Sequence, residues 1–240
     1  MCSQAANPMM SQVCQNLERI RYNVENARTK YRSVNEKIDI MAVTKTVDTE
    51  KINFAVESGI TLLGENRVQE FLSKKDEYLL EAQVHFIGHL QTNKVKYIIN
   101  EVTMIQSVDS VRLISEINRQ AEKNGRIMDV LLEVNIGLEQ SKSGVSAQKL
   151  KELALQAAEY KNVHVRGLMA IPPIGADESL YAEMNELYHK LDESNIDGID
   201  MDILSMGMSG DYELAIKHGS NLVRIGTGLF GARNYNITEG

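Results

Sequence analysis

The chain has 240 residues, of which 43% are hydrophobic and 25% are charged, as is ordinary for a globular protein. Its net charge of −7 argues against nucleic-acid binding, which needs a basic face, but a local site could still hold a small anion. Two cysteines, Cys2 and Cys14, cannot build the disulfide framework of a secreted domain, so we expect a cytoplasmic protein. The first residues do not resemble a signal peptide and no stretch is apolar enough to span a bilayer, so we expect no membrane attachment.

Apolar residues at helical spacing predict an amphipathic helix over about 9–32. After it, strand-like runs alternate with helix-like runs. The expected strands cover 38–44, 61–64, 84–88, 103–108, 129–135, 163–171, 202–206 and 221–225. The expected helices between them cover 49–58, 67–81, 91–100, 110–124, 147–161, 177–194 and 210–219.

This alternation predicts parallel pairing, because parallel strands need crossover connections. Eight such units favour a (β/α)8 TIM-type barrel, and a doubly wound open sheet is the alternative. No linker rich in proline, glycine and serine divides the chain. We therefore expect a single domain over residues 1–240, with the barrel at about 38–231 and an extra helix before it.

Lys45 ends the first apolar run, in the sequence Ala-Val-Thr-Lys-Thr. In barrels of this type, reactive groups gather at the carboxyl ends of the strands. A lysine drawn partly out of water there has a lowered pKa, and its neutral amine can attack an aldehyde to form a Schiff base. A lysine that extends past the strand end into solvent is the plainer alternative.

Two glycine-containing loops follow the seventh and eighth expected strands. Gly226, Gly228 and Gly231 match the dinucleotide pattern G-x-G-x-x-G, but only nine residues follow, too few for the second strand and acidic residue that this reading requires. Barrels often bind phosphate at this place, and Thr227 adds a hydroxyl donor beside the glycine amides. The preceding loop, with Ser209 and Gly210, has the same character. Together the two loops predict a phosphate site, although each alone is typical of a tight turn.

Arg224 lies inside the last expected strand, on the same face as Gly226. A buried guanidinium needs a partner, which would be either a carboxylate such as Glu133 or a ligand. An amine at Lys45, an arginine and a phosphate cradle suit pyridoxal 5′-phosphate (PLP), with Arg224 facing the ring nitrogen. Because a guanidinium cannot accept a proton, the pyridine would stay neutral and be a weak electron sink.

The chain resembles the PLP homeostasis proteins (the YggS/PROSC family), whose fold is similar to the N-terminal barrel of alanine racemase. The resemblance covers about residues 10–235. It rests on motifs at 42–46, 64–70, 85–94, 167–169, 205–211 and 223–227. It implies PLP on Lys45, Arg224 near the ring, and phosphate contacts from Ser209 or its neighbours and from Gly226 and Thr227. Asn66 and Met206 are expected to line the cofactor.

The resemblance implies a PLP carrier or regulator in vitamin B6 balance, with little turnover. Only one base, Lys45, is evident, whereas a racemase needs two, and the second domain that completes alanine racemase is not expected here. Apo PLP-dependent enzymes are the expected partners, and the expected state is a monomer. The alternatives are a weak amino-acid racemase of the same fold and a Schiff-base aldolase acting on a phosphorylated sugar.

Overall fold

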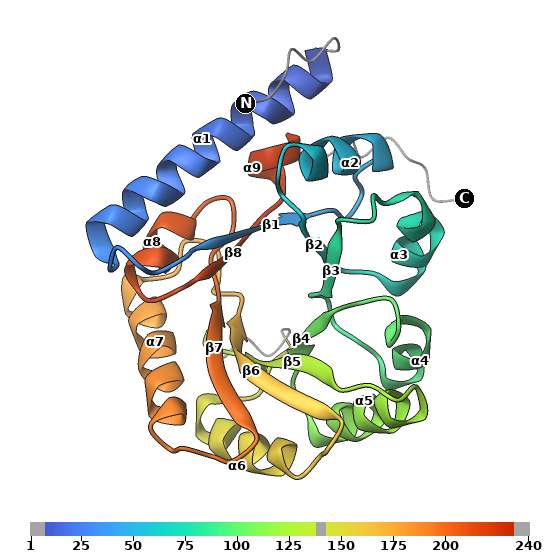
Figure 1. Cartoon of the computed structure of the whole chain (residues 1–240). Helices are drawn as coiled ribbons and strands as arrows, with labels where there is room; N and C mark the ends of the chain where they lie inside the picture. Colours follow the sequence, from blue (N-terminus) through green and yellow to red (C-terminus); the bar gives the residue numbers. More distant parts are fainter. Residues whose placement is uncertain (1–7, 138–142, 233–240) are drawn as a thin grey trace.

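The computed structural model describes residues 8–137 and 143–232, in which eight parallel strands close into a barrel (Figure 1). Each strand pairs with its neighbours in the sequence, and β8 returns to β1. The strands are β1 Asp39–Val43, β2 Leu62–Glu65, β3 Gln83–Phe86, β4 Met104–Val108, β5 Met128–Val134, β6 Val163–Ala170, β7 Ile199–Ser205 and β8 Leu222–Ile225. The predicted barrel is confirmed, and the open sheet is excluded.

Helices surround the barrel and cover its outer face (Figure 1). They are α2 Thr49–Glu57, α3 Val68–Lys74, α4 Val95–Ile98, α5 Val111–Lys123, α6 Ala147–Ala158, α7 Glu178–Asp192, α8 Tyr212–Lys217 and α9 Thr227–Phe230, with short 3-10 turns η1 Lys75–Glu77 and η2 Thr92–Lys94. Among the described residues, no helix is both long and apolar enough to cross a membrane.

The predicted N-terminal helix is present as α1 Pro8–Tyr31. It lies outside the ring, against α8 and α9 (Figure 1). Its buried face carries Val13, Leu17 and Ile20, which join the main hydrophobic core. The buried Asn16 amide also donates to the carbonyl of Leu229 in α9 (3.0 Å). The first helix is therefore fixed to the last strand–helix unit of the chain.

Several elements differ from the prediction. The segment expected to be one helix over 67–81 ends at Lys74 and continues as η1, because Lys74 and Tyr78 turn their side chains toward a buried carboxylate described below. The expected helix over 91–100 divides into η2 and α4. Strand β7 begins at Ile199, and α9, which follows the last glycine loop directly, was not predicted.

A candidate cofactor site at the carboxyl ends of the strands

Lys45 lies two residues after the end of β1, in a turn, and is partly buried. Thr44 before it is fully buried, and Thr46 after it has a φ of 59°, a left-handed conformation that β-branched residues rarely adopt. The backbone N–H of Thr46 donates to the Glu70 carboxylate at 2.5 Å. The backbone on both sides of the lysine is thus held by tertiary contacts.

A buried ion-pair network lies behind this turn. Glu65 is completely buried, and its Oε1 accepts hydrogen bonds from the hydroxyls of Thr44 (2.6 Å) and Tyr78 (2.5 Å). Lys74 Nζ lies 3.3 Å from the same oxygen and also donates to the carbonyl of Thr44 (2.8 Å).

Burial and the Glu65 charge raise the pKa of Tyr78, so its hydroxyl remains a donor. Sequence reasoning missed this network. Its only signal was a charged residue, Glu65, at the end of an apolar strand.

The two glycine loops meet at Ser209. Its Oγ accepts hydrogen bonds from the backbone N–H groups of Gly226 (3.3 Å) and Gly228 (3.0 Å). A Cβ added to Gly228 would lie only 3.1 Å from that oxygen, so a larger residue would crowd the space between the loops. Two amides that converge on one oxygen, next to the hydroxyl-bearing Thr227, have the geometry and chemistry to hold a phosphate group. The residues present therefore fit the phosphate of PLP.

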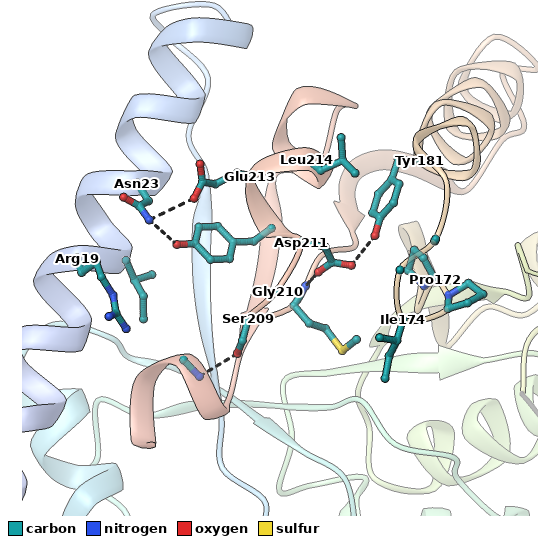
Figure 2. Close-up of a pocket in the computed structure, with 17 residues that line it drawn as sticks. Arg19, Asn23, Pro172, Ile174, Tyr181, Ser209, Gly210, Asp211, Glu213 and Leu214 are labelled. Carbon is teal, nitrogen blue, oxygen red and sulfur yellow. Dashed lines mark hydrogen bonds between the residues drawn. The ribbon is translucent and has the colours of Figure 1, made fainter. Parts of the chain in front are cut away.

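The loop that carries Ser209 is itself tightly ordered. Gly207 has a φ of 91°, and a Cβ there would meet the side chain of Ala215 at 2.5 Å, so only glycine fits. Asp211 accepts from the N–H of Met208 and from the hydroxyl of Tyr181, each at 2.5 Å (Figure 2). Both contacts hold the backbone of the loop in place around Ser209 and Gly210.

An outer pocket of about 730 Å³ lies beside this loop, between α1, α8 and the loop that precedes α7 (Figure 2). Ser209, Gly210 and Gly228 form part of its wall. Met206 is instead fully buried in the main hydrophobic core. This position favours packing as the role of the Met206 side chain, which was expected to line the cofactor.

Arg224 is 3% exposed and projects from β8. Its Nη1 donates to the hydroxyl of Ser205 (2.5 Å) and its Nη2 to the carbonyl of Ala170 (2.7 Å). Within the described part of the chain it forms no ion pair, so the alternative of a salt bridge to Glu133 is wrong. Burial lowers the pKa of Arg224 to about 10, partly offset by Glu133 and Asp211, and the guanidinium stays charged at neutral pH.

A relay of hydrogen bonds continues from Arg224 through the buried interior of the barrel. Ser205 donates to Gln106 Oε1 (2.8 Å), and Gln106 Nε2 lies 2.9 Å from His85 Nδ1. Burial lowers the pKa of His85 to about 4, so the ring is neutral near pH 7. Because a guanidinium only donates, each group in the relay donates to the next, and His85 accepts at Nδ1. Sequence reasoning missed the role of Gln106.

In the register of β1 and β2, Val43 pairs with Gly64. If this register is continued by two residues, Asn66 lies level with Lys45. It forms part of the wall of a cavity of about 270 Å³, together with Gly88, His89 and Glu133. Burial and repulsion by Asp109 raise the pKa of Glu133 to about 7, against the opposing effect of Arg224. Asn66 thus follows β2 as Lys45 follows β1, and β2 lies on the other side of β1 from β8, which precedes the last glycine loop.

The register of β1 and β8 completes the arrangement. Met41 pairs with Arg224, and a Cβ on Gly226 would contact Val43 at 3.5 Å. Arg224 therefore lies in β8, while Lys45 and the Gly226 and Gly228 amides follow the neighbouring strands β1 and β8, at the end of the barrel where barrel enzymes keep their active sites.

The model of the alanine racemase N-terminal domain matches residues 15–234. A pyridoxal phosphate homeostasis protein of Aquifex aeolicus is 41% identical over 225 residues, which cover 92% of this chain and 99% of the relative. The protein of that name from Escherichia coli K12 is 36% identical, with 95% and 99% covered. The chain belongs to the pyridoxal phosphate homeostasis protein family.

Solved structures agree with this family assignment. PipY of Synechococcus elongatus without PLP has a TM-score of 0.82 at 30% identity, covering 92% of this chain and all of PipY. PipY with PLP bound has a TM-score of 0.79 at 29% identity, with the same coverage. An alanine racemase of Clostridium difficile has a TM-score of 0.74 at 16% identity and shares the fold, and this chain covers 58% of its length.

Proposed function

We propose that this protein binds PLP and serves in vitamin B6 homeostasis, with Lys45 as the covalent attachment point. The observation that carries the proposal is the convergence of the Gly226 and Gly228 amides on Ser209 Oγ, with Gly226 against Val43 at the end of β1, two residues before Lys45. That the related PipY has been solved with PLP bound supports it.

In this proposal, Gly226, Gly228 and Thr227 hold the phosphate together with Ser209 and Gly210. Arg224, fixed by Ser205 and Ala170, presents a permanent cation to the pyridine nitrogen. Asn66 lies at the aldehyde end, beside Lys45. PLP, when bound, supplies an aldehyde that condenses with amines and a ring that withdraws electrons. Arg224 cannot give the ring nitrogen a full positive charge, which weakens that withdrawal and favours storage over catalysis.

We further propose that the protein acts as a cytoplasmic monomer that hands PLP to apo-enzymes. The low cysteine content supports the compartment. A transfer assay with an apo-acceptor enzyme tests the carrier role, and transfer no faster than spontaneous release would count against it. Sedimentation of the loaded protein tests the monomer. Incubation with single-enantiomer amino acids tests for racemase activity, and loss of optical purity at enzymatic rates would overturn the assignment as a carrier.

The covalent site is tested by reduction of the PLP-loaded protein with borohydride, followed by peptide mass mapping. We expect a pyridoxyl group on Lys45. Lys45→Ala should lose the visible absorption band, whereas the matched control Lys37→Ala, at a lysine whose side chain is 83% exposed, should keep it. A label on another lysine, or an unchanged band in Lys45→Ala, would overturn the proposal.

A further inference from the structure

Lys45 occupies the first of the two central positions of a tight turn. The backbone N–H of Val47 donates to the carbonyl of Thr44 at 3.1 Å and closes this turn. Thr46, at the second central position, has a φ of 59°, where glycine or asparagine is usual. Among the described residues, the other non-glycine residue with a positive φ is Asn195, a residue type that tolerates this conformation. The turn therefore contains backbone strain directly beside the lysine, and strain that persists at such a place points to a functional constraint.

Helix α3 contacts both peptide groups that flank Lys45. On one side, Lys74 Nζ donates to the carbonyl of Thr44 at 2.8 Å. On the other side, the N–H of Thr46 donates to Glu70 Oε1 at 2.5 Å. The same Glu70 oxygen lies 2.9 Å from Lys74 Nζ, so one ion pair within α3 joins the two contacts.

This arrangement fixes the backbone of Lys45 itself. The two soft dihedrals of a residue describe the rotation between the peptide group before it and the peptide group after it. An ion pair that holds both groups therefore fixes the direction in which the Lys45 side chain leaves the turn. The side chains of Lys74 and Glu70 are 10% and 22% exposed, so water and salt screen this pair less than a surface pair.

We propose that Glu70 is a positioning residue that aims Lys45 at the bound cofactor. Its carboxylate holds Thr46 in the left-handed conformation, and its ion pair with Lys74 ties this contact to the carbonyl of Thr44. The inference rests on the proposed function, because it takes Lys45 as the attachment point of PLP. In that attachment the lysine nitrogen forms a bond to the aldehyde carbon, and the aldehyde oxygen leaves as water. Glu70 takes no part in this exchange of atoms and acts only through the turn.

A positioning role separates covalent attachment from the other contacts of the cofactor. The phosphate contacts proposed for Ser209, Gly226 and Gly228 come from the loops after β7 and β8, whereas Glu70 acts on the turn after β1. Loss of the Glu70 carboxylate should therefore reduce attachment to Lys45 and leave phosphate binding unchanged. A residue that only supported the fold would affect both parts of cofactor binding together.

The test compares PLP with 4′-deoxypyridoxine 5′-phosphate, an analogue that lacks the aldehyde, in calorimetric titrations. We expect Glu70→Ala to weaken binding of PLP by about tenfold or more, since a hydrogen bond to a charged group is lost. Binding of the analogue should stay unchanged. Glu70→Gln keeps an oxygen that accepts from Thr46 and Lys74, so it should retain most of the affinity for PLP. The matched control is Glu186→Ala, because Glu186 forms the same i,i+4 pair with Lys190 on α7, and it should change neither affinity.

Hydrogen exchange at the Thr46 amide, followed by NMR without cofactor, gives a second readout. This N–H loses its acceptor in Glu70→Ala, so its exchange should accelerate by about tenfold or more, and it should not change in Glu186→Ala. Circular dichroism and cooperative unfolding establish that each variant is folded.

Three results would overturn this inference: equal weakening of PLP and its analogue by Glu70→Ala, no weakening of PLP, or unchanged exchange at Thr46. If one of them occurs while borohydride mapping of the starting protein places the pyridoxyl group on Lys45, the proposed function survives. Absence of that label from Lys45 in the starting protein would refute the proposed function instead.

Discussion

Lys74 offers the sharpest test of how the turn around Lys45 is held. Lys74→Met removes the cation that pairs with Glu65 at 3.3 Å and the donor to the carbonyl of Thr44. Glu65 is completely buried and Lys74 is 9% exposed, so the variant leaves an uncompensated buried charge. Breaking such a buried pair costs about 3–5 kcal/mol of unfolding free energy.

Equilibrium unfolding in urea, followed by circular dichroism, measures this cost. Lys190→Met is the matched control, because Lys190 pairs with Glu186 on α7 with both side chains more than half exposed. We expect that control to cost less than about 1 kcal/mol. The double variant Glu65→Gln with Lys74→Met removes both charges of this pair and leaves Glu70, the more exposed carboxylate that Lys74 also contacts at 2.9 Å. It should be less destabilised than the sum of the single variants by about 1–3 kcal/mol.

If Lys74→Met loses no more stability than Lys190→Met, the ion pair does not hold the turn. If the double variant is simply additive, the cost arises from lost packing of the lysine stem and not from a charge left unpaired.

Three further predictions concern the cofactor loops and the buried groups around them. Burial raises the pKa of Glu133 from its ordinary 4.5 to about 7. The free energy of unfolding therefore falls by about 3 kcal/mol as the pH rises from about 4.5 to above 7, because the buried carboxyl must ionise in the folded protein. In urea unfolding, Glu133→Gln should therefore stabilise the protein by about that amount at pH 8 and by nothing at pH 4. An equal effect of the substitution at both pH values would contradict this prediction. Gly228→Val fills the space next to Ser209 Oγ and should weaken binding of PLP at least tenfold while sparing phosphate-free pyridoxal. Equal loss of both ligands in a spectroscopic titration would count against a phosphate cradle. Gln106→Leu interrupts the relay between Ser205 and His85. It should lower the free energy of unfolding by about 1–3 kcal/mol in the same assay and shift the visible PLP band. An unchanged band would mean that the relay does not orient Arg224.

The barrel was predictable because its signals are local. Each strand is a short apolar run, and each helix has apolar residues at helical spacing. The alternation of strands with helices then predicts parallel pairing, because parallel strands need crossover connections. Ser209 and the glycines at 226 and 228 were likewise visible, because glycine loops have a recognisable composition. The boundaries that failed had tertiary causes. The helix after β2 ends where Lys74 and Tyr78 reach toward Glu65, and the sequence between 67 and 81 alone contains no sign of that contact.

The sequence by itself determined the order of the elements, the position of Lys45 just after the first strand and the composition of the two glycine loops. Only the tertiary structure decided which polar side chains meet. Ser205 and Gln106 are 99 positions apart, and Arg224 and Ala170 are 54 apart, yet each pair forms a buried hydrogen bond. Closing the barrel brings such groups together at the carboxyl ends of the strands, and burial then requires that each find a partner. In the described residues, the exceptions are Glu65 Oε2, Asn66 Oδ1 and Ser107 Oγ, which are buried without a hydrogen-bond partner.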